Sequence, residues 1–251
     1  MSGYCAEVQV EDCYVIEDRG KSKNMTLRGN GFMAVWHDIK DEGETEYNQW
    51  HTVEHMPERV STPGFLAGRR YVDWNLAKYR YFTLYEGAEL ETFASEEYRR
   101  RLNNPSEWTF RMQPNFLNFA RSACLTMSTT GLGTGGALAT IRLNVTDENV
   151  FITQAGSVLE AAAVLHGISG IHLGAARPDT TRIQTKETEL RADTGEDVFG
   201  AVVMIEGIGR REVEEALKDV QVRLANLATV TAAEAATYDL AYQLTTEDLN
   251  R

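Results

Sequence analysis

Apolar and aromatic residues recur along this chain in short runs that alternate with longer, more polar stretches. Runs rich in β-branched and aromatic residues, bounded by turn-forming residues, predict strands. Stretches without that pattern predict helices, and we expect Pro57 to disturb one of them. In chain order, the first half predicts a strand at 31–39, a helix at 44–60, strands at 65–74 and 78–85, a helix at 90–101 and a strand at 119–127.

The same order of elements returns in the second half, which indicates an internal repeat of about one hundred residues. The order β-α-β-β-α-β is the ferredoxin-like motif. We therefore predict an α+β protein in which tandem ferredoxin-like repeats form one barrel, since closure within one chain removes exposed strand edges. The second half predicts a strand at 137–145, a helix at 155–165, strands at 170–176 and 198–205, a helix at 210–227 and a strand at 235–244.

The repeats divide the chain into four parts. We expect an N-terminal extension at 1–30, a first repeat at 31–130, a Gly-rich linker at 131–136 and a second, degenerate repeat at 137–251. The linker matches G-x-G-x-x-G, but a dinucleotide site needs a helix after that loop. Here a strand follows, so a flexible linker is the better interpretation.

Composition narrows the class of protein. The chain has 251 residues, with 37 acidic and 25 basic side chains and a formal charge of -12. Binding to nucleic acid or to an anionic membrane needs clustered cations, so we expect neither. No apolar run approaches the roughly 18 residues of a membrane span, and the N-terminus does not resemble a secretory signal. Three cysteines without a CxxC pair favour a reducing compartment, and we expect a cytoplasmic protein.

The first repeat holds the densest chemistry. It contains all four Trp and three of the five His of the chain. At about 100° per residue, one face of the predicted helix at 44–60 presents aromatic, His and Glu side chains beside a separate apolar stripe. Such a helix can line a pocket next to the core. The members of that face are Tyr47, Trp50, His51, Glu54 and Glu58, with His55 at its edge.

Two chemical interpretations compete for this helix. The segment 51–55 matches H-x-x-E-H, a pattern of inverted zinc peptidases, but it lacks a third ligand and Pro57 follows closely. We therefore expect no metal. The other interpretation is metal-free acid–base catalysis, with Glu54 positioning His55 and raising its basicity. His37, on the neighbouring strand, would be the second proton carrier.

Three motifs carry a family resemblance. They are Glu-His-x-Pro at 54–57, Pro-Gly-Phe at 63–65 and Arg-Arg-Tyr at 69–71. With them, the segment 32–85 resembles the first repeat of the dimeric α/β-barrel superfamily and, within it, the EthD-like group. The second half lacks Glu-His-x-Pro and has His172 where Arg69 would be. The resemblance implies that this chain forms the barrel alone, as an intramolecular dimeric α/β-barrel, and it leaves room for a homo-oligomer.

The resemblance also implies a small-molecule enzyme with a cavity between sheet and helices. We expect cofactor-independent isomerisation, cyclisation or elimination on a small apolar carbonyl or aromatic-derived metabolite. A haem-dependent dehydratase or monooxygenase is the alternative, and a non-catalytic binder of a hydrophobic metabolite is another. Arg69 and Arg70 point to opposite faces of one strand, so only one can reach the cavity. The residues expected to bind substrate are Trp36, Tyr47, Trp50, His51, Arg69, Tyr71 and Tyr81.

Overall fold

A computed structural model describes residues 27–181, 183–191 and 199–250. Most of the predicted N-terminal extension therefore lies outside the described residues. The order β-α-β-β-α-β occurs twice, as the alternation of apolar residues predicts. The first repeat contributes β1 (Gly31–Ile39), β2 (Phe65–Val72), β3 (Tyr81–Gly87) and β4 (Phe116–Gly131), and the second contributes β5 (Ala137–Val145), β6 (Ile168–Ala176), β7 (Ala201–Gly207) and β8 (Val230–Thr245).

The eight strands close into one barrel in the order β1-β3-β2-β8-β5-β7-β6-β4, and every neighbouring pair is antiparallel. Each repeat forms half of it with the ferredoxin-like order, β4-β1-β3-β2 and β8-β5-β7-β6. The two 16-residue strands join the halves, because β4 pairs first with β1 and then with β6, while β8 pairs first with β5 and then with β2. The predicted fold class, two ferredoxin-like repeats in one intramolecular barrel, is confirmed.

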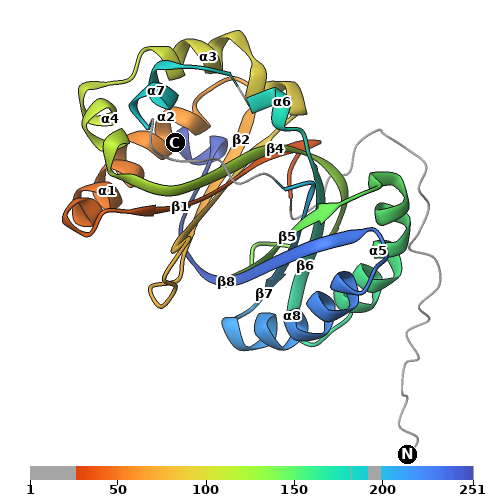
Figure 1. The fold of residues 1–251 in the computed structure, drawn as a ribbon. Coiled ribbons are helices and arrows are strands. Elements are labelled where there is room, and N and C mark those ends of the chain that lie inside the picture. Colours follow the sequence, from red (N-terminus) through yellow and green to blue (C-terminus); the bar gives the residue numbers. More distant parts are fainter. Residues whose placement is uncertain (1–26, 182, 192–198, 251) are drawn as a thin grey trace, which may run out of the picture.

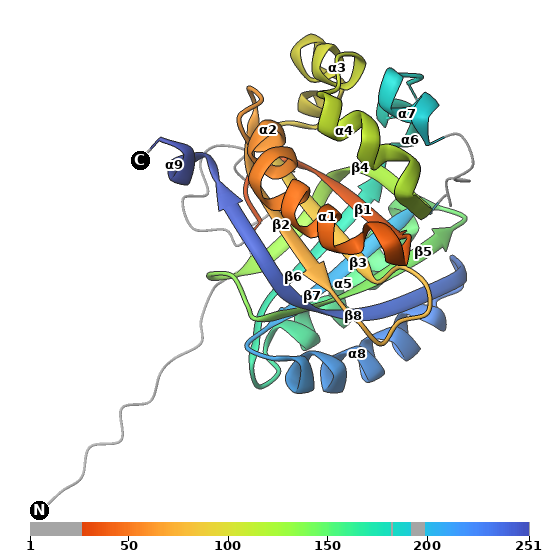
Figure 2. The same cartoon turned by 90° about the vertical axis from the view of Figure 1, so that its left-hand side faces the viewer.

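Helices cover the barrel on two opposite sides (Figures 1 and 2). The second repeat is covered by α5 (Glu148–Ala163) and α8 (Arg210–Ala225), and a short α9 (Thr246–Leu249) follows β8. Among the described residues no helix combines the length and apolar character needed to cross a bilayer. The first repeat is covered by α1 (Glu44–Trp50), η2 (His51–His55), α2 (Met56–Val60), α3 (Glu96–Asn103) and α4 (Glu107–Met112), with the short turns η1 (Asp41–Gly43), η3 (Leu90–Ala94) and η4 (Gln113–Asn115) between them.

The period of two along each strand separates two environments. On β1, Phe32 and Trp36 point into the barrel and join the core cluster inside it. Val35 and His37 point outward, toward the helices of the first repeat. The same rule sends Arg69 inward and Arg70 outward on β2. The alternation of side chains between the two faces of each strand thus decides which polar side chains can meet beneath the helices.

The helical segments show one predicted disturbance and several differences from the prediction, among them the start of α5 at Glu148 and the presence of α9, which was not predicted. The predicted disturbance near Pro57 is present as a π-helical turn over His51–His55, and the chain stays helical on both sides of that turn. The predicted helix at 90–101 is η3 followed by α3, separated at Ser95, whose side chain caps α3. Helix α4 was not predicted. In the long connection between β6 and β7, α6 (Pro178–Thr181) and α7 (Lys186–Leu190) were also not predicted.

Candidate functional site

A cavity of about 40 Å³ lies between the outer face of the first-repeat sheet and the helices above it. Its floor comes from β1, β3 and β4, and its roof comes from η2, α2 and α3. One further wall belongs to the second repeat, through Glu187 on α7 and Arg191 just after it. All three histidines of the first repeat, His37, His51 and His55, line this cavity.

The strand and the helix hold these histidines by different contacts. His37 on β1 is almost fully buried, its Nε2 lies 2.8 Å from the Tyr47 hydroxyl, and its ring stacks on Tyr81 at a centroid distance of 5.3 Å. His51 and His55 come from the π-helical turn, and their rings lie 5.2 Å apart. A residue spacing of four in a widened turn therefore directs both imidazoles into one cavity.

Burial keeps all three imidazoles neutral. Desolvation, with the nearby positive charge of Arg70 and Arg191, lowers the pKa of His37 from 6.5 to about 3. Desolvation also lowers the pKa of His51 and of His55 well below 6.5, with further contributions from the charges of Arg70 and Arg59 respectively.

Each of these imidazoles also has a buried Nδ1 atom that receives no hydrogen bond from the part of the protein that the structure describes. Buried polar atoms without a partner are rare, and each one calls for a reason such as catalysis or a bound ligand. A neutral imidazole with one uncommitted nitrogen can accept or donate a proton.

Glu54 does not support His55 as expected. Its carboxylate faces α4, where it accepts hydrogen bonds from the Ser106 hydroxyl at 2.5 Å and the Thr109 hydroxyl at 3.1 Å, and from the Trp50 indole at 3.2 Å. In the widened turn the two side chains diverge, although their residues are adjacent. Glu54 therefore ties α1 and the π-helical turn to α4.

Three predicted binding residues lie inside the barrel instead of in the cavity. Trp36 donates from its indole to the Thr140 hydroxyl at 3.2 Å and packs on the interior core. Arg69 forms buried ion pairs with Glu86 at 2.6 Å and Glu206 at 2.9 Å. It also donates a hydrogen bond to the hydroxyl of Tyr71, which is the third of these predicted residues. The arginine on the helix side of β2 is Arg70.

Of the remaining predicted binding residues, His51 lines the cavity, and Tyr47, Trp50 and Tyr81 surround the histidines without lining it. The Tyr47 hydroxyl contacts His37, and the Trp50 ring lies against His55 at a centroid distance of 4.3 Å. The Tyr81 hydroxyl hydrogen-bonds to Glu44 at 3.1 Å and to Asn48 at 3.3 Å. These residues orient the imidazoles.

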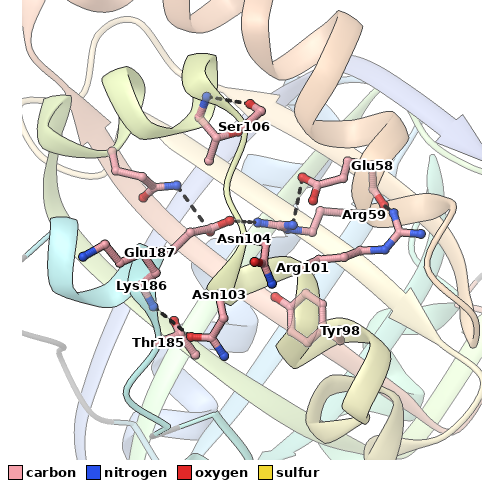
Figure 3. A network of polar contacts seen from close by, with 12 residues as sticks. Glu58, Arg59, Tyr98, Arg101, Asn103, Asn104, Ser106, Thr185, Lys186 and Glu187 are labelled. Atoms are coloured by element: carbon pink, nitrogen blue, oxygen red, sulfur yellow. Dashed lines mark hydrogen bonds and ion pairs between the residues drawn. The ribbon is translucent and has the colours of Figure 1, made fainter.

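Several cavity residues were not predicted. Arg59 is buried between Glu58 at 3.0 Å and Glu187 at 2.5 Å, and this contact joins the two repeats (Figure 3). Nothing in the sequence pattern places Glu187 near Arg59, 128 positions away. Thr83 and Tyr85 also line the cavity. The sequence did contain a signal for these two residues, because the period of two places them on the same strand face as Tyr81. That pattern is also typical of sheet packing.

The size and the donor set of the cavity limit the groups that it can hold. Among the described residues no three His, Cys, Asp or Glu side chains are arranged to hold a metal ion. A volume of about 40 Å³ accommodates roughly three water molecules, at about 10–15 Å³ each. A porphyrin does not fit this cavity in the described conformation.

Comparison with known proteins identifies the fold. No family model matches the chain, and no curated protein matches it. Among solved structures, a candidate monooxygenase from Fusobacterium nucleatum aligns over 87% of this chain and 95% of its own, with a TM-score of 0.57 and 12% identity. The chain has the dimeric α/β-barrel fold.

Two further structures share this barrel. An anthrone oxidase-like protein aligns over 86% of this chain and 92% of its own, with a TM-score of 0.55 and 12% identity. A candidate monooxygenase from Lactobacillus acidophilus aligns over 86% of this chain and 96% of its own, with a TM-score of 0.53 and 11% identity. At such identities the likeness establishes the dimeric α/β barrel and no reaction. Membership of the EthD-like group stays a prediction.

Proposed function

We propose that this chain is a cofactor-independent enzyme that moves protons on a small carbonyl compound, by isomerisation, cyclisation or elimination. The observation that carries the proposal is the set of three neutral imidazoles, each with an uncommitted nitrogen, around one cavity. His55 and His37 are the proposed proton carriers, and His51 joins them because the π-helical turn directs it into the same cavity. We propose that this reaction takes place in the cytoplasm.

The lowered pKa values keep His37, His51 and His55 in the proton-accepting form, and the charge of a developing anion would offset the weaker basicity that comes with a low pKa. With no ligand, desolvation keeps the proton off His37, His51 and His55. When a substrate carbon loses its proton, the resulting enolate places a negative charge beside the imidazole. An opposite charge at that distance favours the imidazolium form, so the transfer is promoted by the substrate itself.

The size of the cavity limits the size of the substrate. Sites for drug-sized ligands have volumes of about 300–1,000 Å³. The cavity of about 40 Å³ favours a carbonyl compound of a few heavy atoms over the aromatic-derived metabolite that the sequence also allowed. Apolar walls from Met33, Leu102, Phe116 and Phe119 suit the hydrocarbon part of such a molecule.

Deuterium exchange into simple ketones tests this proposal, because it detects proton abstraction whatever the natural substrate is. Acetone, butanone and cyclopentanone are incubated with the protein in D₂O, and loss of the α-proton signals is followed by NMR. We expect exchange above the buffer rate for at least one ketone, and His55→Ala should slow it by about 10²-fold or more, the usual contribution of a general base.

A matched control uses the exposed His166 in the second repeat. His166→Ala should exchange at the wild-type rate. Exchange that survives His55→Ala unchanged would remove His55 from the mechanism, and the absence of exchange with every ketone would favour a binding protein. A Soret band after incubation with haem would contradict the cofactor-independent proposal.

A further inference from the structure

Two hydroxyl groups of β3 share the cavity floor below the histidines. Thr83 and Tyr85 both point to the helix side of the sheet, and both side chains are buried. Their neighbours across the strand pair on β1 are Val35 and Met33, so Thr83 lies diagonally from His37 on the same face, with about 7–8 Å between their backbones. The hydroxyls therefore belong to the sheet side of the cavity, whereas His51 and His55 belong to the helix side.

Neither hydroxyl has a hydrogen-bond partner among the residues that the structure describes. An unsatisfied buried hydroxyl costs about 1–3 kcal/mol, so two of them facing one cavity indicate a role with a ligand. The other tyrosine hydroxyls between the sheet and the helices of the first repeat already have partners. The Tyr47 hydroxyl contacts His37, the Tyr81 hydroxyl contacts Glu44 and Asn48, and the Tyr98 hydroxyl lies 3.9 Å from the sulfur of Met33.

Both hydroxyls stay neutral and can donate a hydrogen bond. Burial raises the pKa of Tyr85 well above its ordinary value, so the phenol keeps its proton. Gly68, opposite Tyr85 on β2, makes room for its ring, since a Cβ atom there would lie 3.2 Å from the ring and 2.1 Å from the sulfur of Met56. The packing of β2, β3 and α2 therefore determines the position of the phenol.

We propose that the Tyr85 and Thr83 hydroxyls donate hydrogen bonds to the carbonyl oxygen of the substrate and stabilise the negative charge that forms there. This inference rests on the proposed function, and it makes the substrate class an enolisable ketone or aldehyde. In the step, the α C–H bond breaks and its proton goes to an imidazole nitrogen. The electron pair forms a carbon–carbon double bond, and the carbonyl π pair moves to oxygen, so no oxidant or reductant is needed.

Infrared difference spectroscopy of bound acetone tests the inference. Acetone with ¹³C at the carbonyl is bound to the wild type, Tyr85→Phe, Thr83→Val and the doubly substituted chain. Hydrogen bonding from Tyr85 and Thr83 lowers the stretching frequency, so the wild type should show the lowest frequency and the double variant a frequency near that of acetone in an apolar solvent. Both changes preserve side-chain shape, and thermal unfolding verifies that the variants fold.

Exchange kinetics provide the second readout. Tyr85→Phe should lower kcat for deuterium exchange by about 10²-fold, as loss of one oxyanion donor does, with a smaller effect on KM. Tyr238→Phe is the control for loss of a buried tyrosine hydroxyl inside the barrel, away from the cavity, and it should leave the carbonyl frequency unchanged.

The two measurements separate this inference from the proposed function. A lowered carbonyl frequency that depends on Tyr85, in a protein without exchange activity, would support hydrogen bonding of the hydroxyls to a carbonyl ligand and refute the proposed function. Exchange that depends on His55, with a carbonyl frequency unaffected by both hydroxyl variants, would overturn the inference and retain the proposed function. A wild type that gives neither signal with acetone, butanone or cyclopentanone would overturn both.

Discussion

At the scale of single residues, the cavity depends on imidazoles that stay uncharged. His37 and His51 are buried beside Arg70, and His55 lies near Arg59. Each positive charge adds to the desolvation that removes the proton. The consequence is a link between pH and stability, because the unfolded chain has no such restriction on protonation.

We expect the free energy of unfolding to fall as the pH decreases from 7 to 5. Below the ordinary pKa of 6.5 the unfolded chain binds protons at these histidines and the folded chain does not, so protons favour unfolding. Each histidine contributes at most about 1.4 kcal/mol per pH unit in this window. Urea unfolding at pH 7, 6 and 5 measures the slope.

The partly exposed His55 provides the comparison for that slope. His55→Asn should make the dependence on pH shallower, since one proton fewer is taken up on unfolding. An identical slope in this variant would mean that His55 is not kept neutral in the folded chain.

At the scale of elements, helix α2 packs closely on strand β2 because the strand has a glycine, without a side chain, at the point of contact. Gly68 on β2 faces Met56 on α2 and Tyr85 on β3. The π-helical turn before Met56 sets the phase of α2, and thus determines which residue meets the glycine. Helix and strand are therefore positioned together, and the cavity histidines and hydroxyls with them.

Gly68→Ala should destabilise the protein by about 1–3 kcal/mol, because an added methyl group would overlap the sulfur of Met56 in a packed core. The matched control is Gly156→Ala on α5, where a Cβ atom meets nothing within 4 Å. That change should stabilise the protein by about 0.5–1 kcal/mol, since Ala favours helix. Chemical denaturation of both variants measures the two effects, and equal stabilities would contradict the packing argument.

At the scale of the whole molecule, a polar network inside the barrel joins the two repeats. Glu86 on β3 and Glu206 on β7 occupy equivalent positions, each followed by glycine. Each also accepts a 2.7 Å hydrogen bond from a backbone N–H just before the first strand of its repeat. Arg69 pairs with both carboxylates, and His172 contacts Glu206 at 3.3 Å. The two carboxylates that the pseudo-twofold relation of the repeats makes equivalent thus both pair with one buried arginine.

Arg69→Met should destabilise the protein by about 3–5 kcal/mol, because Glu86 and Glu206 would lose the cation that compensates their burial. Arg100→Met is the control. Arg100 pairs with Glu97 at an exposed site, and its loss should change stability little. Unfolding curves in urea distinguish the two. A small effect of Arg69→Met would indicate that this network does not hold the repeats together.

Most of the fold could be read from residue patterns, because strand and helix periods are local properties. The aromatic strands around His37 and Tyr81 and the doubled β-α-β-β-α-β order needed no tertiary information. The π-helical turn at His51–His55 could not be predicted, since Pro57 indicates a disturbed helix without specifying the form that the disturbance takes. Helix α7 could not be predicted either, because it is short and its side chains find their partners in the other repeat.

The candidate site divides in the same way. The sequence by itself determined that histidines and aromatic residues concentrate in the first repeat, and that Arg69 and Arg70 face opposite ways. Only the tertiary structure decided that Arg70 is the one facing the helices, that Glu54 turns away from His55, and that Thr83 and Tyr85 share the cavity. The reason is that strand alternation specifies two faces without specifying which one closes inward. That choice is made when the barrel closes and the ion pairs of Arg69 are buried inside it.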